Sequence, residues 1–183
     1  MADRYYTLHI AGCTRNLPIL NVTDKLAIAG FVMLGDVELT DACARELAKK
    51  VPPETDYVLT AETKGIPLAE ELARALGMDR YIVARKSVKA YMENALWVDD
   101  VSITTKGTQK LCLDGTDIEH IKGKNVLLLD DVISTGGSMK ALVELTEKAG
   151  GKVIGQACVL AEGDAAKRDD IIFLEPLPLF DAE

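Results

Sequence analysis

From about residue 57 onward, the chain alternates short apolar runs with segments whose apolar residues recur every three or four positions. The runs are typical of buried strands, and the periodic segments are typical of helices. The predicted strands span 57–61, 81–84, 125–129 and 153–160, and the predicted helices span 66–76 and 138–149. Strands and helices in alternation form a mostly parallel sheet covered by helices on both faces, so the pattern predicts an α/β fold.

The remaining segments give weaker patterns. Residues 4–39 mix short apolar runs with glycine and proline, which indicates short strands and turns. An apolar face then predicts a helix that begins at Thr40 or Asp41 and ends near Lys50. At the other end of the chain, the run 171–180 predicts an edge strand followed by an extended tail.

A polar stretch without a steady period separates the two strand–helix–strand units. We expect residues 85–98 to form a loop. Residues 101–105 and 108–113 flank Lys106-Gly107 and predict the two arms of a β-hairpin. Because parallel sheets place ligands at the carboxyl ends of their strands, the loops after residues 61, 84 and 129 are expected to share one cleft.

Size and composition narrow the functional classes. A chain of 183 residues fits one domain, and its net charge of -8 argues against nucleic acid as a partner. The four cysteines show no C-x-x-C spacing, which is typical of reduced thiols. No window holds the roughly 18 apolar residues of a membrane span and no basic leader precedes an apolar run, so we expect a cytoplasmic protein without a membrane partner.

The strongest chemical pattern follows the most apolar strand, where the sequence reads LLLDDVISTGGS from Leu127 to Ser138. A turn with two glycines before a helix offers backbone N–H groups and hydroxyls to a phosphate. The adjacent Asp130 and Asp131 would repel a phosphate, but they can accept hydrogen bonds from sugar hydroxyls. Neither G-x-x-x-x-G-K-[ST] nor G-x-G-x-x-G is present, so the pattern indicates a phosphorylated sugar rather than an ordinary nucleotide loop.

This segment resembles the phosphoribosyl pyrophosphate (PRPP) motif of the type I phosphoribosyltransferases. The resemblance implies that Asp130 and Asp131 hold the ribose hydroxyls and act in catalysis, and that a five-residue turn wraps the 5-phosphate. That turn consists of Ser134, Thr135, Gly136, Gly137 and Ser138. It further implies one domain over residues 1–183, with a small hood from about 1–39 and 161–183.

Two further segments resemble the pyrophosphate-binding parts of that family. Glu62, Thr63, Lys64 and Gly65 are similar to a loop that often contains a cis peptide, which we expect between Thr63 and Lys64. The basic start of the polar stretch is similar to the family's catalytic loop. The resemblance implies that Arg85, Lys86 and Lys89 neutralise the charge of pyrophosphate and that Lys89 also acts in catalysis.

The same resemblance implies a mechanism and partners. The enzyme would transfer the 5-phosphoribosyl group of PRPP to a purine base in nucleotide salvage, as a homodimer. Magnesium would be the cofactor, held mainly by PRPP oxygens and not directly by protein ligands. Val132 and Ile133 form either an apolar wall against the base or ordinary core, and the two interpretations are equally good.

The identity of the base depends on weaker signals. In the hypoxanthine-guanine branch of the family a carboxylate usually stands where this chain has Ser134, poised to take a proton from the purine, and its absence counts against that branch. Adenine and xanthine enzymes tolerate a small residue there, and between these two the resemblance favours adenine. The alternatives are xanthine or another 6-oxopurine, a PRPP-binding regulator without catalysis, and a paralogue that has lost activity. Regulators generally carry a further DNA-binding domain, which this acidic chain has no spare residues to form.

Overall fold

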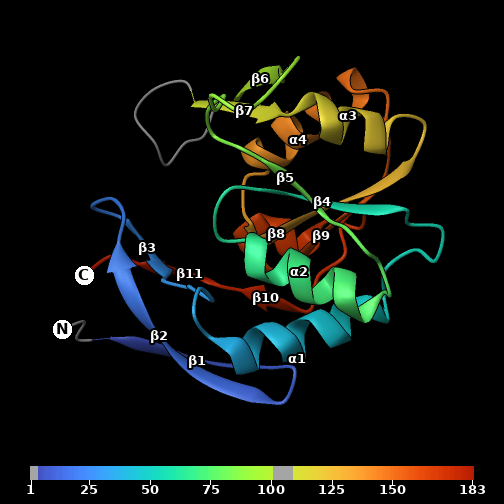
Figure 1. The fold of residues 1–183 in the computed structure, drawn as a ribbon. Helices are drawn as coiled ribbons and strands as arrows, with labels where there is room; N and C mark the ends of the chain where they lie inside the picture. Colours follow the sequence, from blue (N-terminus) through green and yellow to red (C-terminus); the bar gives the residue numbers. More distant parts are fainter. Residues whose placement is uncertain (1–3, 101–108) are drawn as a thin grey trace.

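A computed structural model describes residues 4–100 and 109–183 and contains a five-stranded parallel sheet in the order β10-β9-β8-β4-β5 (Figure 1). All four of its strand pairs are parallel, which confirms the predicted α/β fold. The strands are β4 (Tyr57–Ala61), β5 (Ile82–Ala84), β8 (Asn125–Ile133), β9 (Lys152–Glu162) and β10 (Glu175–Leu177). The two predicted strand–helix–strand units are β4-α2-β5 and β8-α4-β9.

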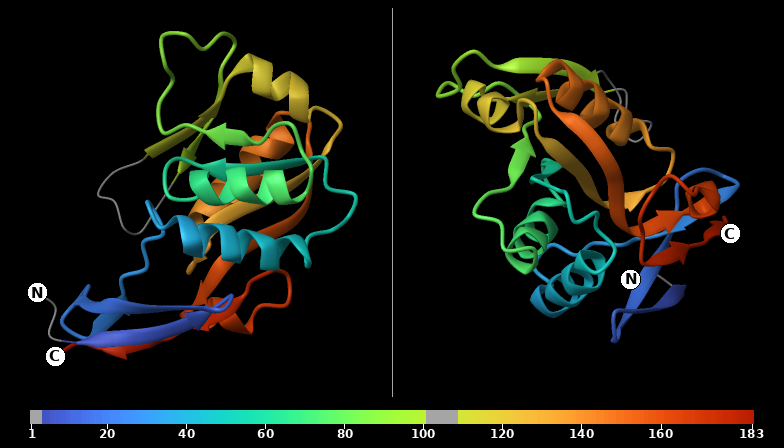
Figure 2. Two further views of the ribbon diagram at one scale, coloured as in Figure 1. Left: turned by 60° about the horizontal axis from the view of Figure 1, so that its bottom comes forward. Right: turned by 90° about the vertical axis from the view of Figure 1, so that its right-hand side faces the viewer.

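Helices cover both faces of this sheet, as Figure 2 shows in its right-hand view. Leu127 and Leu129 of β8 pack in one core with α1 and α2, whereas Val126 and Leu128 pack in a second core with α3 and α4. The alternation of side chains along a strand explains why so apolar a run is needed when both faces are buried. The helices are α1 (Val37–Ala48), α2 (Ile66–Ala75), α3 (Gly115–Ile121) and α4 (Gly137–Lys148).

A second, four-stranded sheet lies beside the parallel one, in the order β1-β2-β3-β11. Its strands are antiparallel, and the last comes from the C-terminal end of the chain (Figure 1). They span β1 (Tyr5–Ile10), β2 (Cys13–Asn21), β3 (Leu26–Ala29) and β11 (Leu179–Asp181), and a 3-10 turn, η1 (Gly163–Lys167), follows β9. Among the described residues, no helix is long and apolar enough to cross a membrane.

The helix α1 begins earlier than the sequence predicts. Its N-cap is Asp36, whose carboxylate accepts a hydrogen bond from the Leu39 amide at 3.1 Å, and the expected caps Thr40 and Asp41 lie within the helix. Arg15 of β2 also contacts Asp36, at 2.6 Å between Nε and Oδ2. This contact between residues distant in sequence favours Asp36 over the other two capping residues and joins the four-stranded sheet to α1.

The second arm of the predicted hairpin, 108–113, is confirmed by β7 (Gln109–Leu113). The described ribbon pairs β6 (Leu96–Asp100) with β7 (Gln109–Leu113), so part of the expected loop 85–98 is a strand. The expected first arm, 101–105, and the turn Lys106-Gly107 lie outside the described residues. Lys110 stacks on the Trp97 ring at 3.6 Å from its centroid, a pairing that supports the register.

The strand β8 also continues past its predicted end. Its pairing with β9 runs to Ile133 opposite Ala161, so Asp130 and Asp131 belong to the strand and not to the turn. The turn before α4 is therefore limited to residues 134–136. Two carboxylates can lie in a central strand here because they are at its carboxyl end, where parallel sheets bind ligands.

Replacement of Leu127 by alanine tests the packing of the central strand. The side chain is fully buried against α1 and α2, so Leu127→Ala is expected to lower the free energy of unfolding by about 2–5 kcal/mol. Leu20→Ala, at a side chain that is 48% exposed, is the matched control and is expected to cost less than about 0.5 kcal/mol. Urea unfolding curves measure both, and equal losses would contradict this description of the core.

Candidate active site

The loops that follow β4, β5 and β8 meet at the carboxyl edge of the parallel sheet. Glu62, after β4, lies 3.2 Å from the Arg85 guanidinium after β5. Lys64, in the same loop as Glu62, lies 2.7 Å from the Asp131 carboxylate of β8. These contacts confirm that the three loops share one region, as the strand pattern predicts.

The two carboxylates of β8 have different surroundings. Asp131 is 2% exposed and accepts its hydrogen bond from the Lys64 ammonium, while its own backbone N–H donates to Asp130 Oδ1 at 2.9 Å. Asp130 lines a cavity. Burial, and then the negative charge of Asp131, raise the pKa of Asp130 above the usual aspartate value. A hydrogen-bond donor in the cavity, such as a hydroxyl group, would favour the ionised form of Asp130.

The turn after β8 is the segment for which the sequence predicts an anion cradle. Ser134 and Thr135 are exposed, and Gly136 has a φ of 79°, a left-handed conformation that glycine adopts without strain. The helix α4 starts at Gly137, so its free N–H groups face the turn. The Arg168 guanidinium lies close to Gly136. A Cβ added at this glycine would be 3.2 Å from one of the guanidinium nitrogens, so Arg168 limits the space behind the turn.

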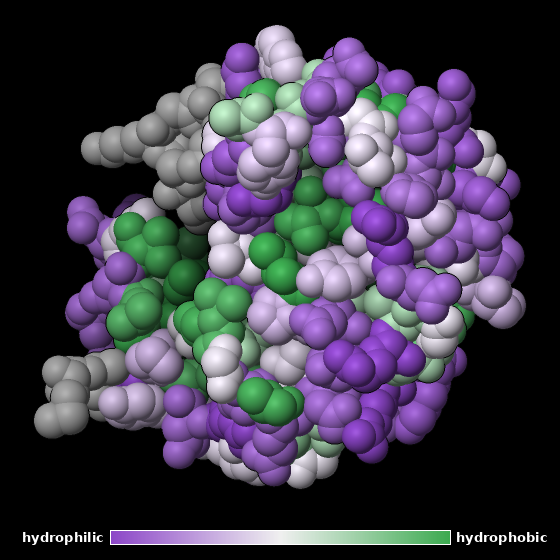
Figure 3. All heavy atoms as spheres, in the orientation of Figure 1, coloured by the Kyte–Doolittle hydropathy of each residue, from purple (hydrophilic) through white to green (hydrophobic). Residues whose placement is uncertain are grey.

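A cavity of about 340 Å³ opens between this turn and the four-stranded sheet. Figure 3 shows apolar side chains gathered around a hollow on that side of the molecule, over β3 and β11. The apolar lining includes Val132 and Ile133, which the sequence assigned either to a base wall or to the core. The complete lining is Val22, Leu26, Ile28, Asp130, Val132, Ile133, Ser134, Thr135, Gly136, Gly137, Ser138, Met139, Glu162 and Leu179.

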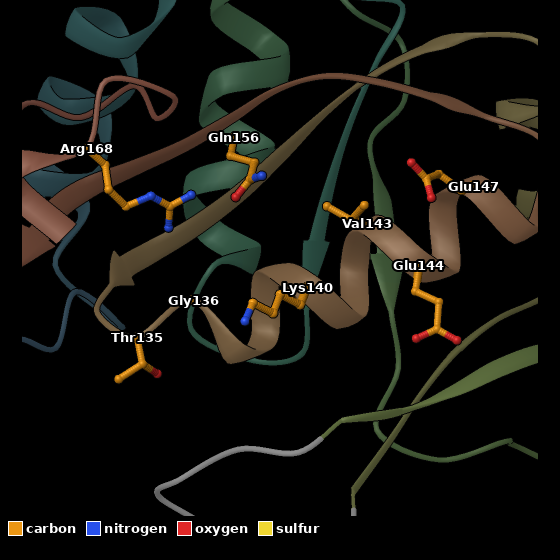
Figure 4. A pocket seen from close by; sticks show the side chains of 8 residues that line it. All are labelled: Thr135, Gly136, Lys140, Val143, Glu144, Glu147, Gln156 and Arg168. Carbon is orange, nitrogen blue, oxygen red and sulfur yellow. The ribbon is translucent and has the colours of Figure 1, made fainter.

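A second cavity, of about 330 Å³, lies on the other side of the same turn. In Figure 4 the Arg168 guanidinium and the Lys140 ammonium point into the space beside Gly136, while Glu144 and Glu147 line its far end on α4. Arg168 is already held by Asp170, at 2.7 and 2.8 Å. This cavity lacks the carboxylates of β8, so the first cavity is the one that combines the turn 134–138 with Asp130.

The basic segment after β5 is held by Glu62. The carboxylate of Glu62 accepts a hydrogen bond from the Lys86 amide at 2.9 Å and pairs with Arg85, and these contacts, the first above all, keep the pKa of Glu62 below its usual value. Arg85 also donates to the Tyr91 hydroxyl at 2.7 Å. Lys89 donates to Ser87 Oγ at 2.5 Å. The Arg85 guanidinium and the Lys86 backbone therefore lie against the loop that contains Lys64.

The cis peptide of that loop joins Glu62 to Thr63, so its expected place between Thr63 and Lys64 is wrong by one residue. The Glu62 amide still donates to Ala84 in the neighbouring strand, whereas the Thr63 carbonyl already accepts from Ile66 at the start of α2. The change from strand to helix therefore falls between residues 62 and 63.

Sequence reasoning missed two parts of this site. Glu162, the last residue of β9, lines the cavity together with Ser134. The apolar residues Val22 and Leu179 of the cavity wall are 55% and 47% exposed. A carboxylate directly after an apolar run was the available indication for Glu162, but the sequence alone does not place it beside Ser134.

Comparisons with known proteins give consistent matches. Residues 37–177 match the family model described as "Phosphoribosyl transferase domain". The chain is 31% identical to a hypoxanthine/guanine phosphoribosyltransferase of Methanococcus voltae. The aligned region covers 77% of this chain and 71% of that protein. An adenine phosphoribosyltransferase structure from Thermoanaerobacter pseudethanolicus has a TM-score of 0.64 and 24% identity, over 79% of this chain and 84% of that one. The adenine phosphoribosyltransferase structure from Rhodothermus marinus has a TM-score of 0.57 and 26% identity, over 76% of this chain and 77% of that one.

Gly65 offers a test of how tightly the β4–α2 loop packs on β8. Its φ of -73° suits any residue, but an added Cβ would overlap Thr60 Oγ1 and approach the Asp130 backbone to 3.7 Å. We expect Gly65→Ala to lower the free energy of unfolding by about 1–3 kcal/mol and to weaken the Lys64–Asp131 contact. Urea unfolding measures the loss.

The double variant Thr60→Ala/Gly65→Ala provides the control. Thr60 Oγ1 is buried without a hydrogen-bond partner among the described residues, so its removal makes room for the new methyl and leaves no donor or acceptor unpaired. We expect the double variant to recover most of the lost stability. If it is as unstable as Gly65→Ala, the clash with Thr60 is not the cause.

Proposed function

Because the chain belongs to the phosphoribosyltransferase family, we propose that this purine phosphoribosyltransferase uses adenine as its base, joining it to the ribose 5-phosphate of PRPP with release of pyrophosphate. The observation that carries the proposal is the cavity in which Asp130, the turn 134–138 and an apolar wall meet. These three parts suit a sugar, a phosphate and a flat base, respectively.

The donor's ribose phosphate would lie along the end of β8. The N–H groups at the start of α4 and the hydroxyls of Ser134, Thr135 and Ser138 would hold the 5-phosphate. Asp130 and Asp131 would accept hydrogen bonds from the ribose hydroxyls. Glycine at 136 and 137 allows the phosphate to approach the backbone closely.

The pyrophosphate would lie on the other side of the acidic pair, toward the β4 loop. Lys64 is 48% exposed although it pairs with Asp131, so its ammonium can also contact the leaving group. Thr63 and Gly65 of the same loop, together with Arg85, Lys86 and Lys89, would complete the pyrophosphate site. Glu62 would repel pyrophosphate, and its contacts with the basic segment give it the role of holding that segment in place.

Magnesium fits this arrangement as an ion shared with the donor. Asp130 and Asp131 supply carboxylate oxygens, the ligands that magnesium prefers, but no group of three metal-binding side chains occurs in the part of the chain that the structure describes. The remaining ligands would have to be oxygens of PRPP and water. When bound, the ion would neutralise the charge that develops on pyrophosphate.

The residues of the chain would then act mainly through charge and position. Cleavage between ribose C1 and pyrophosphate leaves positive charge on the sugar and negative charge on the leaving group. Asp130 and Asp131 lie on the sugar side, and the cations Lys64, Arg85 and Lys89 on the other. The four-stranded sheet would serve as the hood that covers the base and excludes water.

Two observations support adenine. First, the cavity's described lining contains two carboxylates and no lysine or arginine, so it offers acceptors for an amino group but no cationic donor for a 6-oxo group. Second, Ser134 stands where hypoxanthine-guanine enzymes usually carry a carboxylate. The Rhodothermus marinus protein, 26% identical in sequence, is an adenine phosphoribosyltransferase.

The second candidate base is a 6-oxopurine. It is favoured by the curated relatives, since the Methanococcus voltae protein, 31% identical to this chain, is named a hypoxanthine/guanine phosphoribosyltransferase. Xanthine belongs to the same chemical class. A PRPP-binding regulator without catalysis would use the same turn and acidic pair but would release no pyrophosphate.

Pyrophosphate release separates these candidates. The protein is incubated with PRPP and magnesium and, in separate reactions, with adenine, hypoxanthine, guanine or xanthine. We expect the value of kcat/KM to be highest with adenine, because only that base has an amino group at position 6. A higher value with a 6-oxopurine would reject adenine, and PRPP binding without release for every base would reject catalysis.

Asp131→Asn tests the acidic pair. The substitution keeps the shape of the side chain but removes the charge that faces the developing cation, so we expect kcat to fall by about 10²–10³-fold with little change in melting temperature. Asp79→Asn, at an exposed aspartate after α2, is the matched control and should keep full activity. An Asp131→Asn enzyme with unchanged steady-state kinetics would refute the assigned role.

A further inference from the structure

Glu162 is a carboxylate of the cavity to which the mechanism above assigns no step. It ends β9, next to the position where β8 continues into the phosphate turn, because Ala161 pairs with Ile133. Glu162 and Ser134, the residues that directly follow this pair, both line the cavity. A negative charge so close to a phosphate site is unfavourable for donor binding, so its presence needs a separate explanation.

The surroundings of Glu162 make it a stronger base than an exposed glutamate. Apolar side chains of β3 and β11 line the cavity beside it. Burial raises the pKa of Glu162, while the Ser134 hydroxyl and the charge of Lys64 oppose the rise. The other carboxylate in the cavity lining is Asp130.

The reaction requires a proton acceptor at this place. A purine attacks through a ring nitrogen that carries a hydrogen, and this proton must leave as the nitrogen–carbon bond forms. The charged groups that line the cavity are Asp130 and Glu162, and Asp130 is assigned to the ribose hydroxyls. The cations Lys64 and Arg85 lie outside this lining and are directed at pyrophosphate. A serine hydroxyl such as that of Ser134 is too weak a base.

On the basis of the proposed function, we propose that Glu162 is the catalytic residue that accepts the ring proton of the purine. The ring nitrogen donates its electron pair to ribose C1, the bond from C1 to the pyrophosphate oxygen breaks, and that oxygen keeps the bonding pair. The N–H proton passes to a carboxylate oxygen of Glu162.

The position of Glu162 gives this assignment its physical basis. Glu162 ends the strand that pairs with β8, one residue after the pair Ile133–Ala161. Its side chain therefore shares the cavity with Ser134 and Asp130, between the turn and the apolar wall formed by β3 and β11. A base bound against that wall would have its ring N–H within the same cavity.

Glu162→Gln is the direct test, because glutamine keeps the shape of the side chain and removes the charge that would accept the proton. General base catalysis contributes about 10²–10⁴-fold, so we expect kcat with the preferred purine to fall at least about 100-fold. Glu175→Gln, at an exposed residue of the adjacent strand β10, is the matched control. Unchanged turnover in Glu162→Gln would overturn the proposal.

Three readouts separate proton transfer from support of the turn. Glu162→Gln should bind PRPP in calorimetry with unchanged affinity. Its defect should shrink about tenfold or more with the 8-aza analogue of the preferred purine, whose ring N–H is more acidic. Ser134→Asp in the Glu162→Gln background should restore part of the activity. Weakened PRPP binding with an equal loss for purine and 8-azapurine would overturn the proposal.

The pH profile of kcat gives an independent check. Since the proton acceptor must be ionised, activity should rise with pH through a limb above the usual glutamate range, and this limb should disappear in Glu162→Gln. Asp130 faces the same cavity, so a limb that remains belongs to it. If the wild-type protein is inactive with every purine, both the proposed function and this role are rejected. If the wild type is active and Glu162→Gln shows the same pH profile of kcat, only the role of Glu162 is rejected.

Discussion

The site depends on the pairing of β8 between β4 and β9. The register of this pairing fixes where along the chain the central strand leaves the sheet. It thereby places Asp130, Asp131 and the following turn next to the loops of the neighbouring strands. The contact between Lys64 and the buried Asp131 joins the first of these loops to β8. A shift of one residue in the register would turn the carboxylates to the opposite faces and separate them from Lys64.

Each side of the acidic pair has its own chemical character. Toward β9 and the four-stranded sheet lies an apolar cavity with carboxylates. Toward β4 and β5 lie the cations of two loops, ordered by Glu62. A donor that carries a neutral sugar between two phosphate groups, together with an aromatic base, fits this division of charge. The long apolar run of β8 matters for the same reason, because burial on both faces holds its carboxyl end rigidly.

Much of this arrangement follows from local sequence. The apolar runs and helical periods predict the parallel sheet and its helices, and the residues from 127 to 138 predict the phosphate turn, because both depend on contiguous residues. What depends on distant contacts could not be predicted. The cap of α1 falls at Asp36 because Arg15 contacts it, and β6 forms because Leu96 to Asp100 find partners in β7. Glu162 resembles a solvated strand end until the register of β9 places it beside Ser134.

The central claim is that the turn after β8 binds the 5-phosphate while Asp130 and Asp131 bind the ribose. A crystal structure with PRPP and magnesium tests it most directly. The account predicts the 5-phosphate against the backbone amides of residues 134–138, the ribose hydroxyls at the two carboxylates, and the pyrophosphate near Lys64. A donor bound elsewhere, with this turn free of phosphate, would contradict it.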